Sequence, residues 1–332
     1  MTDMMSRVVV MIAALACCAA PAPAQELPEV KAIIFPGANN WPIWVAEARG
    51  EFAKSGIRVA LTPTPNSVFL MTGLIQGKFD VAIAAIDNLV AYQEGQGEVT
   101  VEGEIDLVAV MGANNGFNSL MASPKVKDVA DFRGRKVAVD AATTGYAFVL
   151  YDILRRNGLN PGDYVVERAG GSGRRWDALR EGKQDGTLLS LPWDIIAANN
   201  GFKRLATSND VGRFQGSAGI VQRKWAAANE AKLVAFIRGY VAGLDWISDP
   251  GNREEAIALL RKNLKSLTPE LADASYKVLL DPSTGLQRKA ELDVAGLRTV
   301  LALRSEYGQP RKTLTDPMKY YDPSYYRKAL GN

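Results

Sequence analysis

Histidine is absent from this sequence of 332 residues, and the two cysteines, Cys17 and Cys18, both lie near the N-terminus. Nucleophilic systems of the Ser-His-Asp and Cys-His kinds therefore cannot be built from the main part of the chain. Zinc, copper and non-haem iron sites normally use His and Cys ligands, so we expect neither a metal site nor a cofactor. Catalysis by carboxylate, lysine or tyrosine stays open, which makes an enzyme disfavoured and not excluded.

A strong net charge is also lacking. The chain has 39 basic and 36 acidic residues, a formal net charge of +3. This balance gives no reason to expect nucleic acid or an anionic membrane as a partner. The proportions of 47% hydrophobic and 23% charged residues are those of a soluble globular protein, and the length suggests two domains.

An apolar run covers residues 8–16, far short of the ~20 residues that a membrane-spanning helix needs. Small residues follow it, and Ala22-Pro23-Ala24 ends in the small-x-small pattern that precedes a signal-peptidase cut. The pattern predicts a signal peptide over residues 1–24 and a periplasmic location. A lipid anchor on one of the two cysteines is the weaker alternative, because Leu15 lies one place later than in the usual motif.

A pattern of seven positions, L-x-x-G-K-x-D, occurs at Leu74–Asp80 and again at Leu179–Asp185. Each copy ends an apparent helix with Gly, a residue that tolerates the left-handed geometry found there. Each copy then leads into a short apolar run, at 81–85 and at 187–191, which is typical of a buried parallel strand. The matching flanks make coincidence the weaker explanation.

The likeness extends upstream of both copies. The predicted strands, helices and second strands are 30–35, 44–54 and 58–62 in the first half, and 136–140, 146–156 and 164–169 in the second half. Each half therefore reads as strand-helix-strand-helix-strand. The expected fold class is α/β with two lobes, each a mainly parallel sheet flanked by helices. Two tandem α/β units, as in many nucleotide enzymes, remain the alternative.

Apolar segments at 105–111, running on to 118–121, and at 217–222 separate the two halves. We expect two hinge strands there. Lobe 1 would then comprise residues 25–112 and 217–332, and lobe 2 residues 113–216.

The C-terminal part reads as helical. An apolar stripe at helical spacing covers 233–247, and further helices are expected at 253–263 and 292–306. Asn252 with Glu255 predicts a capping box. Thr268 followed by Pro269 predicts an N-cap with proline in the first turn.

In open α/β sheets, ligands bind beyond the carboxyl ends of the strands. The loops of two facing lobes would therefore meet in a cleft. Thr143 and Thr144 begin a helix where free N–H groups could receive an anion, or simply cap that helix. Arg174 or Arg175 could bind a carboxylate or sulfonate. Asp87 precedes a helix-like run, as Asp194 does in the second half, so an N-cap role is favoured for both over a ligand contact.

Three stretches carry a family resemblance: Trp41-Pro42, Gly77–Val81, and Asp131–Val139 followed by Thr143-Thr144-Gly145. In this order the sequence resembles the nitrate/sulfonate/taurine and thiamine-precursor substrate-binding proteins of ABC importers. The resemblance covers nearly the whole mature chain. It implies a two-lobed periplasmic-binding-protein fold of type II that closes on its ligand by hinge motion. It also implies delivery to an inner-membrane permease with a cytoplasmic ATPase, and we expect a monomer.

Carried over by position, the cleft would include Asn40, Trp41, Ser67, Asp87, Thr143, Thr144, Arg174 and Trp193. Phe117 and Tyr146 join this set because aromatic side chains can stack on a flat ligand. The expected ligand is a small, anionic organic solute, with sulfonates, aromatic carboxylates, nitrate and pyrimidines left open. Two alternatives stay open: an exported enzyme that uses Asp87 and Asp194 across the cleft, and a ligand-sensing subunit of a membrane signalling protein.

Overall fold

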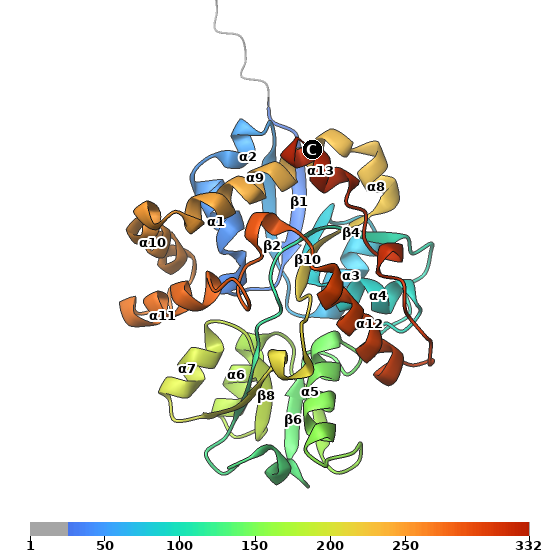
Figure 1. Ribbon diagram of the computed structural model, residues 1–332, viewed down its shortest axis with the longest axis vertical. Helices are drawn as coiled ribbons and strands as arrows, with labels where there is room; N and C mark the ends of the chain where they lie inside the picture. The colour runs from blue at the N-terminus through green and yellow to red at the C-terminus, as the bar shows by residue number, and fades with distance from the viewer. Residues whose placement is uncertain (1–25, 332) are drawn as a thin grey trace, which may run out of the picture.

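The computed structural model describes residues 26–331. The predicted signal peptide, with both cysteines, lies outside these residues. Two five-stranded sheets form the centres of two lobes stacked along the long axis (Figure 1). We call the part around the first sheet lobe 1 and the part around the second sheet lobe 2. None of the helices in this described part is long and apolar enough to cross a membrane.

The sheet of lobe 1 has the strand order β2-β1-β3-β10-β4. Its strands are β1 (Glu29–Ile34), β2 (Arg58–Pro63), β3 (Val81–Ala85), β4 (Leu107–Gly112) and β10 (Ser217–Gln222). Strand β1 is parallel to β2 and β3, whereas β10 runs antiparallel between β3 and β4. The apolar run predicted as a buried strand at 81–85 is β3, the central strand of this sheet.

The sheet of lobe 2 repeats this plan in the order β7-β6-β8-β5-β9. Its strands are β5 (Ser119–Ala122), β6 (Lys136–Val139), β7 (Val165–Arg168), β8 (Gly186–Leu189) and β9 (Lys203–Thr207). Strand β6 is parallel to β7 and β8, and β5 is antiparallel to β8 and β9. The internal repeat predicted from the L-x-x-G-K-x-D pattern is therefore confirmed as two lobes of one topology.

Helices follow the parallel strands in both lobes. They are α1 (Trp41–Ala48), α2 (Glu51–Lys54), α3 (Ser67–Ile75) and α4 (Ile86–Gln93) in lobe 1, and α5 (Gly145–Arg156), α6 (Ser172–Arg180) and α7 (Trp193–Asn199) in lobe 2. The prediction of one helix over 44–54 was wrong. Gly50 has a φ of 69°, in the left-handed region that glycine adopts readily, and it separates α1 from α2.

The C-terminal part is helical, as predicted. It contains α8 (Arg223–Ala228), α9 (Glu230–Ser248), α10 (Arg253–Asn263), α11 (Pro269–Leu279), α12 (Val294–Tyr307) and α13 (Ser324–Leu330). The Thr268 hydroxyl accepts from the Leu271 N–H, which confirms that cap. The capping box predicted at Asn252 was wrong, because its amide instead donates to the Trp246 carbonyl.

The chain crosses between the lobes at 113–118 and 208–216. The crossings touch: the Gly216 N–H donates to the Asn114 carbonyl, and the Asn118 N–H donates to the Ser208 hydroxyl. The prediction of hinge strands was wrong in detail. The apolar segments β4, β5 and β10 belong to the sheets, and the crossings between them contain no strand.

The two lobes are packed against each other. Helix α12 of lobe 1 lies beside α5 of lobe 2 (Figure 1). One continuous cluster of buried apolar side chains contains Leu89 and Leu301 from lobe 1 together with Phe148 from lobe 2. With the lobes packed in this way, a small cavity is left between them.

Candidate solute-binding cavity

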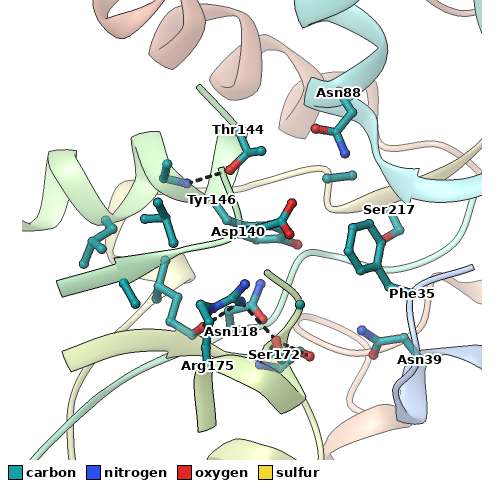
Figure 2. A pocket seen from close by; sticks show the side chains of 18 of the residues that line it. Phe35, Asn39, Asn88, Asn118, Asp140, Thr144, Tyr146, Ser172, Arg175 and Ser217 are labelled. Carbon is teal, nitrogen blue, oxygen red and sulfur yellow. Dashed lines mark hydrogen bonds between the residues drawn. The ribbon is translucent and has the colours of Figure 1, made fainter. Parts of the chain in front are cut away.

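A cavity of about 110 Å³ lies between the lobes, at the carboxyl ends of the parallel strands. That volume holds several water molecules or a compact organic solute. Its polar lining residues are Asn39, Asn88, Asn118, Asp140, Thr144, Tyr146, Ser172, Arg175, Ser190 and Ser217. Phe35, Leu150 and Leu188 are among its apolar ones. In Figure 2, Asp140, Thr144 and Ser172 of lobe 2 face Asn88, Phe35 and Asn39 of lobe 1.

Two of the predicted residues, Thr144 and Tyr146, line this cavity. Thr144 is the N-cap of α5, and its hydroxyl accepts from the Ala147 N–H, so the alternative reading as a cap also holds. The ring of Tyr146 packs against Phe214 of the second crossing, with centroids 5.7 Å apart. Burial raises the pKa of the Tyr146 phenol, so this residue presents a neutral hydroxyl group.

Four other predicted residues are each next in the chain to a residue that lines the cavity. The predicted residues were Asn40, Asp87, Phe117 and Arg174, and the side chains that line the cavity are those of Asn39, Asn88, Asn118 and Arg175. A loop can be located from the end of a strand. The side chain that faces the cavity depends on backbone rotation, which differs by about 100° between neighbours in a helix.

Asn40 and Trp41 turn away from the cavity. The Asn40 amide donates to the carbonyls of Phe35 and Gly37, which holds the loop after β1 in place. The Trp41 ring is fully buried in the core of lobe 1, where its N–H donates to the Ala256 carbonyl at 2.9 Å. Neither residue is among those that line the cavity.

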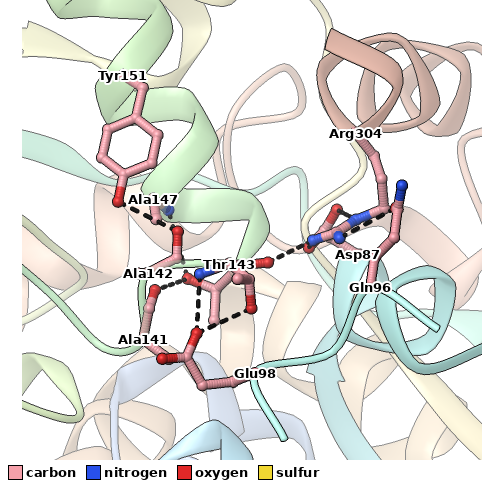
Figure 3. Close-up of polar contacts among 10 residues, drawn as sticks. Asp87, Gln96, Glu98, Ala141, Ala142, Thr143, Ala147, Tyr151 and Arg304 are labelled. Carbon is pink, nitrogen blue, oxygen red and sulfur yellow. Dashed lines mark hydrogen bonds and ion pairs between the residues drawn. The ribbon is translucent and has the colours of Figure 1, made fainter. Parts of the chain in front are cut away.

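Asp87 forms a buried ion pair instead of the expected helix cap. Its carboxylate receives two hydrogen bonds from the Arg304 guanidinium of α12, at 2.6 and 2.5 Å (Figure 3). Both side chains are almost completely buried. Asp194 is likewise buried and receives hydrogen bonds from the Ser119 hydroxyl and Arg204. Neither carboxylate faces the other across the cavity.

Thr143 joins the two lobes. Its N–H and hydroxyl groups both donate to the Glu98 carboxylate of lobe 1, at 3.0 and 2.9 Å, and its carbonyl accepts from Arg304 (Figure 3). Glu98 also pairs with Arg168 of lobe 2 at 2.6 Å. The side chain predicted to bind a ligand is thus bound by a protein carboxylate in this arrangement.

Arg174 is exposed, whereas Arg175 is buried at the cavity wall. The Arg175 guanidinium donates to the carbonyls of Leu188 and Gly170 and to the Ser172 hydroxyl. Burial lowers the pKa of Arg175, and the nearby negative charge of Asp140 opposes this shift. These bonds occupy four of the five N–H groups of the guanidinium.

The remaining predicted residues lie around the cavity. The Ser67 N–H, at the start of α3, donates to a carboxylate oxygen of Asp140 across the lobe boundary, at 3.0 Å. Trp193 lies between Gly37 and Gly173, where an added methyl group on either glycine would come within 3.4 Å of its ring. Phe117 packs at the edge of the apolar core of lobe 1.

Sequence reasoning missed a simple rule. Phe35, Asp140 and Ser190 all line the cavity, and each is the first residue after a parallel strand. The sequence contains this signal, because the ends of the apolar runs were predicted nearly correctly. Most of the predicted residues lie instead at or near helix starts, one to several residues further along the chain.

Residues 24–261 match the model of the NMT1-like family. The chain belongs to this family. No curated protein matches it.

Three solved structures illustrate its structural relatives. The periplasmic nitrate-binding protein NrtA from Synechocystis PCC 6803 has 15% identity and a TM-score of 0.77, over 92% of this chain and 89% of that one. The ligand-binding component of an ABC-type import system from Staphylococcus aureus, with zinc bound, has 15% identity and a TM-score of 0.72, over 91% of this chain and 99% of that one. The alkanesulfonate-binding protein SsuA from Xanthomonas axonopodis pv. citri, bound to MOPS, has 16% identity and a TM-score of 0.68, over 92% of this chain and 99% of that one.

These likenesses identify the fold as that of periplasmic binding proteins. The same fold occurs in an enzyme, the desulfurization enzyme DSZB, with 13% identity and a TM-score of 0.60 over 92% of this chain and 99% of that one. The fold alone therefore does not separate binding from catalysis. The residues around the cavity must do so.

Proposed function

We propose that this protein is an extracytoplasmic receptor that captures a small organic solute between its lobes and delivers it to an ABC importer. The observation that carries the proposal is the polar cavity at the junction of two equivalent lobes. Two lobes that close over a solute can bury it almost entirely, which allows tight binding without any catalysed reaction. The family and the import-system relative in Staphylococcus aureus support the same role.

The other parts of the proposal follow from this role. A periplasmic location would require export, for which residues 1–24 supply a predicted signal peptide. The partner would be an inner-membrane permease with its cytoplasmic ATPase. The receptor would bind this permease as a monomer. We also propose the division of the chain at 112/113 and 216/217, which coincides with the places where it leaves and re-enters the sheet of lobe 1.

An anionic group on the solute would find its donors at the start of α6. Gly171, the N-cap of this helix, and Ser172 line the cavity, and the N-cap position has no side chain to satisfy the first N–H groups. Arg175 keeps one N–H group beyond those bonded to the protein. The exposed Arg174 would not contribute.

The alternative of a carboxylate enzyme loses support from the side chains it required. Asp87 sits in a buried ion pair with Arg304, and the buried Asp194 pairs with the exposed Arg204; neither aspartate is among the residues that line the cavity. A role as a sensing subunit would use the same cavity and the same closure. Co-purification with a permease and an ATPase would favour import, and co-purification with a membrane kinase would favour sensing.

Thermal unfolding of the mature protein in the presence of small solutes tests receptor function directly. Nitrate, ethanesulfonate, benzoate and pyrimidines form a first panel. A solute at a hundredfold excess over its Kd should stabilise the fold by ~2.7 kcal/mol. Turnover of a substrate without any stabilisation by a small solute would contradict the proposal.

A further inference from the structure

Asp140 is the cavity residue whose chemistry the role described above leaves unexplained. It follows β6 directly and lines the cavity between the lobes. One carboxylate oxygen, Oδ2, accepts the Ser67 N–H from the opposite lobe at 3.0 Å. That bond fixes the orientation of the carboxylate when the lobes meet. Figure 2 shows the side chain directed into the space between Thr144, Asn88 and Phe35.

The other oxygen, Oδ1, is buried and has no hydrogen-bond partner among residues 26–331. Two other carboxylates in the described chain also have a buried oxygen without such a partner, those of Asp152 and Asp194. Each of these two forms an ion pair with an arginine, at 2.6 and 3.2 Å. Within the same residues Asp140 has no cation at ion-pair distance, so of these three carboxylates it is the one without an ion pair.

Arg175 does not supply the missing partner. It lines the same cavity, but four of its N–H groups are committed to Leu188, Gly170 and Ser172. Its position therefore gives long-range attraction to Asp140 without a hydrogen bond. The Asp140 residue is only partly buried, but its Oδ1 atom is shielded from water, and a shielded carboxylate oxygen without a hydrogen bond is costly unless a donor from outside the protein completes it.

We infer that the solute presents a positively charged N–H group, of the amine or amidine kind, to the carboxylate of Asp140. A charge-assisted bond of this type is stronger than a bond between neutral groups and neutralises the charge of this carboxylate. The amides of Asn39 and Asn88 lie on the facing wall and can accept or donate at the rest of the solute. With an anionic group at the start of α6, the solute would be amphoteric.

This inference rests on the proposed receptor function, and pairs of probes with similar shape test it. Acetamidinium is compared with acetate, and β-alanine with butanoate, by calorimetry and thermal unfolding of the mature protein. The nitrogen-bearing member of each pair should bind at least tenfold more tightly than its partner. In Asp140→Asn this preference should disappear, because the amide can still accept the Ser67 N–H and carries no charge.

Asp194→Asn is the matched control, since it neutralises a buried aspartate of the same lobe outside the cavity lining. It should keep the preference of the wild-type protein. Circular dichroism establishes that both variants are folded. Binding of acetate or butanoate as tight as that of the nitrogen-bearing partners, or an unchanged preference in Asp140→Asn, overturns the inference. It is also overturned if the anion panel binds while neither nitrogen-bearing probe does. If no probe of any kind binds, the receptor function itself fails.

Discussion

Arg304 is fully buried and bonds to groups in both lobes. It pairs with Asp87, donates to the Thr143 carbonyl, and lies over the ring of Phe148 at 4.6 Å. Arg304→Met should leave Asp87 as a buried, unpaired charge and should lower the free energy of unfolding by about 3–5 kcal/mol. Urea denaturation measures this loss.

The double variant Asp87→Asn with Arg304→Met is the control for that prediction. It removes both charges and should recover a large part of the stability, because no uncompensated carboxylate remains. If the single and double variants are equally unstable, the stability that Arg304 contributes comes from its packing and not from its charge.

At the scale of residues, the sequence located the loops that line the cavity better than the side chains that face it. The loops after the first and third strands of each half were found, because a strand end is visible as the end of an apolar run. The choice between Asp87 and Asn88 was not visible, since it depends on Arg304, more than two hundred positions away in the chain. Long-range partners of this kind are invisible to local patterns.

At the scale of elements, two glycines allow the two crossings between the lobes to pack closely against each other. A methyl group added at Gly216 would lie 2.2 Å from the Cα atom of Gly116, and the backbone of Gly116 itself has a φ of 76°. Gly216→Ala should therefore push the crossings apart and destabilise the fold, with overpacking of this kind costing typically ~1–3 kcal/mol. The urea unfolding midpoint gives the measurement.

Gly251→Ala is a suitable control, because its added methyl group would approach only the Asp249 side chain. A Gly216→Ala protein as stable as this control would mean that the crossings can separate freely. The sequence indicated that two crossings exist. It could not show their contact, since the two segments are about a hundred positions apart in the chain.

Glu94 ties the C-terminal segment to the end of α4. It receives hydrogen bonds from Lys312, Lys319 and Tyr320. Burial alone would raise the pKa of Glu94, but these bonds outweigh it and lower the pKa from its ordinary 4.5 to about 2. The folded pKa is the lower one, so the stabilisation is complete above about pH 4.5 and is lost as the pH falls towards 2.

The unfolding midpoint in urea, followed from pH 7 to pH 3, should therefore fall at the acid end in the wild-type protein. Glu94→Gln should be less stable at pH 7 and should show a smaller fall, because glutamine has no proton to gain. The same acid dependence in both proteins would assign the effect to other carboxylates.

At the scale of the whole molecule, Glu98 connects the lobes on the side of α5. Its carboxylate belongs to lobe 1, yet it is bonded to Thr143 and paired with Arg168, both in lobe 2. The Glu98 side chain is only 11% exposed, although its partner Arg168 is largely exposed. Opening of the lobes must break these contacts, whereas the two sheets would stay intact.

Glu98→Ala should therefore favour the open form without unfolding either lobe. Hydrogen bonds to a charged group are worth about 1.5–3 kcal/mol, enough to shift a nearly balanced equilibrium between open and closed forms by roughly tenfold or more. Small-angle X-ray scattering should give a larger radius of gyration for this variant than for the wild-type protein. Glu102→Ala, at an exposed position close by, should not change it. Because closure encloses the cavity, the same variant should release a bound solute faster, and an unchanged radius with an unchanged release rate would show that contacts other than those of Glu98 hold the lobes together.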